Sequence, residues 1–166
     1  MNALWGYFWP VFAAGLVSGG VAGSFGFRRR GKGAKALAAG IAVSIAAAAL
    51  WHGPLGAADR FTARVERGAR QALDYYEMTK ITAHLHRAPL ARTLILSGPA
   101  DDFQTSELVR LLDQLPGVSR TSWTDRAGGP PLIAEAAGVS ILSFLFGLLL
   151  AYLVELRRRY NAQWTW

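Results

Sequence analysis

Two histidines separated by one residue are the side chains of this sequence with the clearest capacity for metal chemistry. His84 and His86 would share one face of a strand, and two imidazoles can begin a metal site. The sequence contains no cysteine, and no acidic residue pairs convincingly with the two histidines. A solvated strand face is therefore the favoured interpretation, and we expect no metal ion.

His52 is the third histidine, and it follows Trp51 at the end of an apolar run. Such a residue could be an axial ligand of a haem or of a chlorophyll-type pigment, but one histidine without a helical pocket is weak support for a cofactor. We interpret His52 as an interfacial side chain and expect no cofactor. The competing hypothesis, an enzyme or cofactor carrier that uses the histidines, predicts metal or pigment in the purified protein.

The other polar residues do not form a pattern typical of catalysis. Ser97, Ser106 and Ser119 have no His–Asp arrangement that would activate a nucleophile. Asp101 and Asp102 supply too few ligands for a calcium loop and indicate a helix cap. The first two apolar runs carry no charged residue, whereas transporters place ionisable residues within their spans. We expect a protein that is not an enzyme.

Charge and hydropathy place the chain in a membrane. Hydrophobic residues make up 52% of the chain and charged residues only 17%, whereas soluble domains have roughly 25% charged residues. The net charge is +7, but much of it lies in two arginine triplets beside apolar runs, as the positive-inside rule describes. We therefore expect no nucleic-acid partner. The triplets are Arg28, Arg29 and Arg30, and Arg157, Arg158 and Arg159.

Three apolar runs, over residues 4–27, 36–55 and 132–156, predict membrane spans, because a helix of about 20 residues crosses a bilayer. Basic residues follow the first run and none precede it, so a retained helix is favoured over a cleaved signal peptide. Both arginine triplets are expected in the cytoplasm. Three spans satisfy that condition and predict a bacterial inner-membrane protein with a periplasmic N-terminus and a cytoplasmic C-terminus.

Small residues recur at four-residue spacing in the expected spans, which lets helices approach one another closely. Gly15, Gly19 and Gly23 form such a ladder in the first span. We expect the first two spans to pack on each other as a hairpin; the alternative is that a small-residue face receives a helix of another protein. The other faces are Gly40, Ser44 and Ala48 or Ala38, Ala42 and Ala46 in the second span, and Ser143, Gly147 and Ala151 in the third.

Residues 58–129 are expected to be the extramembrane part, because every acidic residue except Glu135 and Glu155 lies there. Apolar residues at three- and four-residue spacing predict two helices, and short apolar or alternating runs predict three strands. The expected elements are a helix over 61–78, strands over 81–85 and 94–96, a helix over 103–115 and a strand over 118–123.

A family resemblance lies within this part. The strand Arg92–Gly98 ends in glycine, and the helix Glu107–Leu112, the turn Leu115–Val118 and a last strand follow. In this order and spacing, the stretch 80–123 resembles a BON domain, the small αββαβ module of bacterial envelope proteins. We expect its Gly98 to adopt a positive φ angle or a close backbone approach, and Gly117 to cap the preceding helix at its C-terminus.

The resemblance implies a binding or attachment module for phospholipid surfaces or protein partners, without catalytic residues. Insertion between spans makes attachment to the membrane redundant and favours contact with protein. The expected fold class is an α-helical membrane protein with three transmembrane helices and a small α+β, BON-like αββαβ periplasmic domain between the second and third. The expected domains are a transmembrane hairpin over 1–57 with a cytoplasmic loop at 28–35, the periplasmic domain over 58–129, and the third span with a cytoplasmic tail over 130–166.

Two functional hypotheses follow from these features. The favoured one is a non-catalytic structural or accessory subunit of a larger inner-membrane complex, with respiratory and photosynthetic complexes as candidate hosts. Its expected partners are the lipid bilayer and other membrane-protein subunits. The alternative is an envelope tether or sensor whose module binds lipid, peptidoglycan or an envelope protein.

Overall fold

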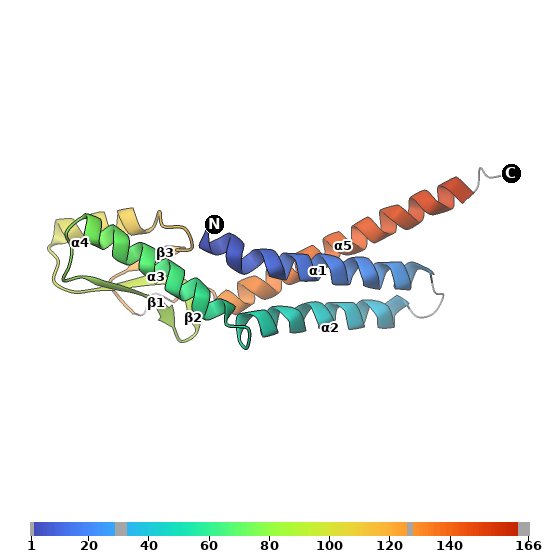
Figure 1. Ribbon diagram of the computed structural model, residues 1–166, viewed down its shortest axis with the longest axis horizontal. Helices are drawn as coiled ribbons and strands as arrows, with labels where there is room; N and C mark the ends of the chain where they lie inside the picture. Colours follow the sequence, from blue (N-terminus) through green and yellow to red (C-terminus); the bar gives the residue numbers. More distant parts are fainter. Residues whose placement is uncertain (1, 29–32, 126–127, 163–166) are drawn as a thin grey trace. The chain divides into compact units, whose positions relative to one another are not determined.

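The computed structural model describes residues 2–28, 33–125 and 128–162, and its longest elements are three apolar helices (Figure 1). These are α1 (Ala3–Arg28), α2 (Gly33–His52) and α5 (Leu132–Ala162). Each is long and apolar enough to cross a membrane, as the sequence predicts. α5 continues beyond the predicted end at residue 156 and carries the second arginine triplet, because arginine is a good helix former.

The chain divides into two compact units. One, which we call the module, combines Met1–Tyr7 with Gly56–Glu135. The other, the helical unit, combines Phe8–Leu55 with Ala136–Trp166. The module is therefore larger than the expected domain over 58–129, because it also includes the first residues of α1 and α5.

The module contains a small mixed sheet and two helices. β2 is the central strand, antiparallel to β1 and parallel to β3. The short turn between β1 and β2 makes them antiparallel, whereas the return through a helix makes β3 parallel to β2. In chain order the elements are α3 (Ala57–Tyr75), β1 (Thr82–Arg87), β2 (Leu90–Ser97), α4 (Asp102–Leu112) and β3 (Arg120–Ser122).

Both module helices differ from their expected limits. α3 was expected over 61–78, but the residues that it buries end at Leu73. The helix stops at Tyr75, and Tyr76 is 45% exposed. α4 begins with a capping box in which the Asp101 side chain accepts a hydrogen bond from the Gln104 amide at 2.7 Å. The aspartate pair is thus a helix cap, as expected.

Two glycines fix the turns of the module. Gly98 has a φ of 138°, and a Cβ atom there would lie 2.6 Å from the Lys80 carbonyl oxygen, so both the backbone angle and the close approach require glycine. Gly117 was expected to cap α4, and this is wrong: the C-cap is Asp113. Gly117 lies in the following turn with a φ of 109°, packed against Val65.

The core of the module recruits residues from α1 and α5. Tyr7 is 2% exposed, and its ring centroid lies 5.5 Å from that of Phe61 in α3. Leu132, at the start of α5, is fully buried. Ala91 forms a β-bridge with Pro131 just before α5. These contacts explain why the module extends beyond the stretch with soluble composition.

Candidate functional site

The glycine ladder of α1 packs against α5. A Cβ atom added at Gly15 would collide with the Ser143 hydroxyl, and one added at Gly19 would collide with the Phe144 carbonyl. At Gly23 it would lie 2.7 Å from the Ala151 Cβ. The first two spans do contact each other, as expected, through Gly40 and Ala22, but the partner of the glycine ladder is the small-residue face of the third span.

The contact between α1 and α5 is reciprocal. A Cβ atom added at Gly147 of α5 would collide with the Leu16 carbonyl oxygen and lie 2.8 Å from the Gly20 nitrogen. Small residues on both helices therefore allow backbone to approach backbone, the arrangement that gives transmembrane helices their van der Waals contact. The two predicted small-residue faces, Gly15-Gly19-Gly23 and Ser143-Gly147-Ala151, lie against each other.

α2 buries a single stripe made of Gly40, Ser44 and Ala48. A Cβ atom at Gly40 would lie 2.5 Å from the Ala22 Cβ and 2.9 Å from the Phe144 ring. The Ser44 hydroxyl lies 2.5 Å from the Ser140 hydroxyl, and both side chains are buried. α2 thus contacts α1 and α5, and its other small-residue face, Ala38, Ala42 and Ala46, is exposed.

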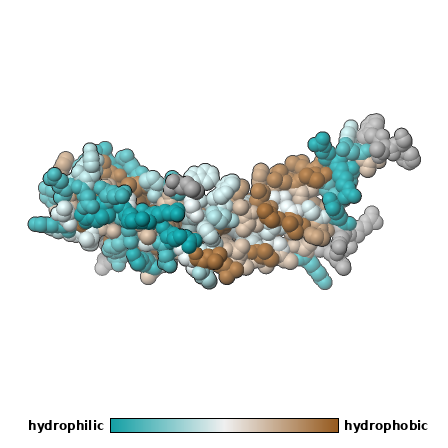
Figure 2. All heavy atoms as spheres, in the orientation of Figure 1, coloured by the Kyte–Doolittle hydropathy of each residue, from teal (hydrophilic) through white to brown (hydrophobic). Residues whose placement is uncertain are grey.

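Large apolar side chains cover the outside of the helical unit. Val17, Val43 and Leu142 are each more than 60% exposed. In Figure 2 the hydrophobic residues gather over the three long helices, whereas the arginine-bearing end of α5 is hydrophilic. This pattern, small residues inside and large apolar residues outside, suits helices surrounded by lipid.

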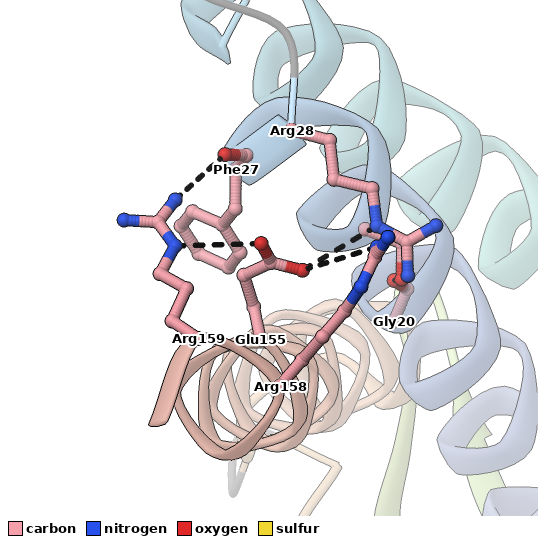
Figure 3. Close-up of polar contacts among 7 residues, drawn as sticks. Gly20, Phe27, Arg28, Glu155, Arg158 and Arg159 are labelled. Carbon is pink, nitrogen blue, oxygen red and sulfur yellow. Dashed lines mark hydrogen bonds and ion pairs between the residues drawn. The ribbon is translucent and has the colours of Figure 1, made fainter. Parts of the chain in front are cut away.

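The ends of α1 and α5 meet in a cluster of charges. Glu155 lies between Arg28, Arg158 and Arg159 (Figure 3). Its carboxylate is 3.4 Å from Arg28 Nε, 4.0 Å from Arg158 Nη1 and 3.4 Å from Arg159 Nε. We call these four residues the arginine cluster. The contact between Glu155 and Arg28 joins residues far apart in the chain, and the sequence did not predict it.

The arginine cluster also caps α1. Arg159 donates a hydrogen bond to the Phe27 carbonyl oxygen at 3.3 Å (Figure 3), one of the carbonyls that a helix C-terminus leaves without an internal partner. Just inside this end, the Phe27 and Tyr152 rings meet edge to face with centroids 5.8 Å apart. Members of both arginine triplets therefore lie at one end of the helical unit, with Arg157 exposed beside them. Arg29 and Arg30 lie outside the described residues.

Arg92 is the polar centre of the module. Its guanidinium donates to Glu135 Oε2 at 2.9 Å and to the Gly117 carbonyl at 3.1 Å. Both side chains of the ion pair are only 21% exposed, so the pair joins β2 to the first turn of α5. The sequence did not predict this pair, because its members lie far apart in the chain. The available signal was a single arginine within an apolar strand and a single glutamate near the start of the third span.

A shallow pocket of about 410 Å³ lies on the module. Glu66 lines it and accepts hydrogen bonds from the Arg87 guanidinium at 3.0 Å and from the Leu85 amide at 3.1 Å. The second bond satisfies an amide of an edge strand, which blunts an otherwise open edge. Asp59, Thr62, Ala63, Glu66, Arg87 and Leu90 line the pocket.

His84 and His86, the two histidines weighed as the start of a metal site, both lie on β1. His84 is exposed, and His86 lies 3.0 Å from the Pro89 carbonyl and 3.9 Å from Asp125. Within residues 2–28, 33–125 and 128–162, no group of three or more potential ligands could hold a metal ion. Ser97 bonds to Thr82 across the sheet at 2.8 Å, a structural contact.

The module exposes large aromatic side chains to solvent. Tyr75 is 80% exposed and Phe103 is 74% exposed. Tyr75 and Tyr76 pack edge to face with ring centroids 5.1 Å apart. Exposed aromatic residues outside a membrane span are typical of contact surfaces, because they contribute much of the energy of protein interfaces.

Comparison of the chain with protein-family models, with curated proteins and with solved structures gave no match.

Proposed function

We propose that this chain is a non-catalytic inner-membrane subunit that anchors and presents a periplasmic BON-like αββαβ module to a protein partner within a larger membrane complex. The observation that carries the proposal is a difference between the surfaces of the two units. The small-residue faces of the helical unit are largely used within the chain, whereas the module leaves Tyr75, Tyr76 and Phe103 exposed.

The orientation belongs to the proposal. Arg28 and Arg159 approach the same carboxylate, which is consistent with both triplets on one side of the bilayer, and the positive-inside rule makes that side cytoplasmic. Reporter fusions after Lys35 and after Trp166 are then expected to report a cytoplasmic location, and a fusion after Gly129 a periplasmic one. A cytoplasmic signal from the Gly129 fusion would contradict this orientation.

The order helix, strand, strand, helix, strand within 57–122 supports the BON-like assignment. Binding without catalysis is what that resemblance implies, and the exposed aromatic residues give the module a surface suited to it. A respiratory or photosynthetic complex is a candidate host.

Affinity purification of the full chain in mild detergent tests the proposal. We expect membrane-protein partners to co-purify with the wild-type chain, and to be lost from a variant carrying Tyr75→Ser, Tyr76→Ser and Phe103→Ser. The matched control carries Gln71→Ser and Gln114→Ser, two exposed polar positions of the same helix regions. A chain that purifies only as a free monomer, or a triple variant that keeps every partner, would overturn it.

A further inference from the structure

The arginine cluster has more positive charge than its carboxylate can neutralise. Arg28, Arg158 and Arg159 share Glu155, and three positive charges against one negative charge leave two in excess. A guanidinium has five N–H donors, of which one carboxylate uses few. The cluster therefore carries excess positive charge, which a bound anion would neutralise.

Exposure shows that these donors are available. The side chains of Arg28, Arg158 and Arg159 are 53%, 64% and 65% exposed, whereas Glu155 is 16% exposed. The guanidinium groups of the three arginines converge on the Glu155 carboxylate (Figure 3), and each remains more than half exposed. The three arginines therefore present several donors to one ligand.

The position of the cluster selects the ligand. Arg28 ends the apolar helix α1, and Arg158 and Arg159 follow the apolar part of α5. Side chains at the end of a membrane span lie at the depth of the lipid headgroups, and arginine matches phosphate geometry through paired N–H donors. The neighbouring exposed apolar side chains Leu153, Val154 and Leu156 suit acyl chains.

We infer that the arginine cluster binds the phosphate of an anionic phospholipid. Each arginine contributes attraction for the headgroup, whereas the Glu155 carboxylate, which contacts all three arginines, lowers the net charge of the site and repels the headgroup. The two signs give the inference a distinctive consequence. Removal of Arg158 ends one ion pair and weakens lipid binding, whereas neutralisation of Glu155 ends all three ion pairs and strengthens it, because a negative charge beside the headgroup is lost.

Native mass spectrometry of the full chain in detergent, titrated with dioleoylphosphatidylglycerol, tests this inference. Dioleoylphosphatidylcholine, which has the same acyl chains and no net charge, is the comparison lipid. We expect the wild-type chain to prefer the anionic lipid by at least about fivefold, and Arg158→Gln to reduce its affinity for that lipid about fivefold. Arg120→Gln, an exposed arginine of β3, is the matched control and should leave affinity unchanged.

Glu155→Gln is the second variant, and we expect it to raise affinity for the anionic lipid about fivefold. If this variant fails to fold, Arg158→Gln decides alone, because Arg158 makes the longest contact of the cluster. Equal affinity for the two lipids, or equal behaviour of Arg158→Gln and Arg120→Gln, would overturn the inference. So would displacement of the lipid by inorganic phosphate at equal concentration and constant ionic strength, because that would show a free-anion site to which the acyl chains add nothing.

Discussion

Most of the side chains that the helical unit buries are small, with Phe144 as an exception, whereas the module buries many large apolar ones. In the helical unit, Gly19 and Gly147 are buried and Leu142 is 69% exposed. In the module, Phe61 is 2% exposed and Leu94 is fully buried. Water drives large apolar groups into the core of the module, but lipid offers helices no such drive, so close backbone contact must hold them together. Adding bulk should therefore damage one unit, and removing bulk should damage the other.

Removal of bulk from the module should have the largest effect. Phe61→Ala deletes a buried ring that packs on Tyr7, and such truncations cost about 3–5 kcal/mol. Hydrogen exchange of module peptides in the full chain would measure the loss. Phe103→Ala, at a 74% exposed position, is the control and should change stability by less than about 0.5 kcal/mol. Similar losses in both variants would contradict the burial of Phe61.

Addition of bulk to the helical unit should have the next largest effect. Gly19→Leu places a side chain against the Phe144 carbonyl, and overpacking costs about 1–3 kcal/mol, or more where backbone must move. Unfolding in mixed detergent micelles would report it. Gly138→Leu on α5 adds the same side chain where no atom lies within 4 Å, so we expect little change there; equal effects at the two glycines would break the comparison.

A smaller effect is expected from the polar contact inside the helical unit. Ser44→Ala removes the buried hydrogen bond to Ser140, and interhelical hydrogen bonds in membranes contribute about 0.6 kcal/mol and at most about 1.7. A double-mutant cycle with Ser140→Ala isolates this term. Ser24→Ala, which removes only a bond to Gly20 within α1, is the control, and a coupling energy of zero would mean that packing alone holds α2.

The smallest effect is a pH dependence on the surface of the module. A hydrogen bond from Arg70, with its charge, lowers the pKa of Asp74 below its ordinary value of 3.8. A depressed carboxylate pKa adds stability above that ordinary value, and the stability is lost as the pH falls through the folded-state pKa. Asp74→Asn should therefore lower the melting temperature slightly at pH 7, and that effect should disappear as the pH falls through the lowered folded-state pKa of Asp74. A deficit that persists in acid would show that the charge is not responsible.

The sequence was most informative about features that depend on neighbouring residues. The three apolar runs became α1, α2 and α5, and the aspartate pair became the cap of α4. Helix ends were less accurate: α3 ends at Tyr75 and α4 at Leu112, where the apolar spacing continued. The spacing of apolar residues cannot show where tertiary contacts cease to stabilise a further helical turn.

The sequence was least informative about partners distant in the chain. It identified the glycine ladder of α1 but assigned it to the neighbouring span, whereas Gly19 faces Phe144. It singled out Glu135 and Glu155 but did not identify their ion-pair partners, Arg92 and Arg28. Several faces have small residues at the same four-residue spacing, so the spacing does not show which of them pack together; that depends on the three-dimensional packing.

By itself, the sequence determined that the chain has three segments able to cross a bilayer and a charged part between the second and third, because hydropathy and charge are summed along the chain. The tertiary structure alone decided that α5 is the helix on which α1 and α2 both pack, that the module completes its core with Tyr7 and Leu132, and that one carboxylate gathers arginines from both triplets. The reason is that such contacts depend on which surfaces fit together, and local composition does not determine the shape complementarity between distant segments.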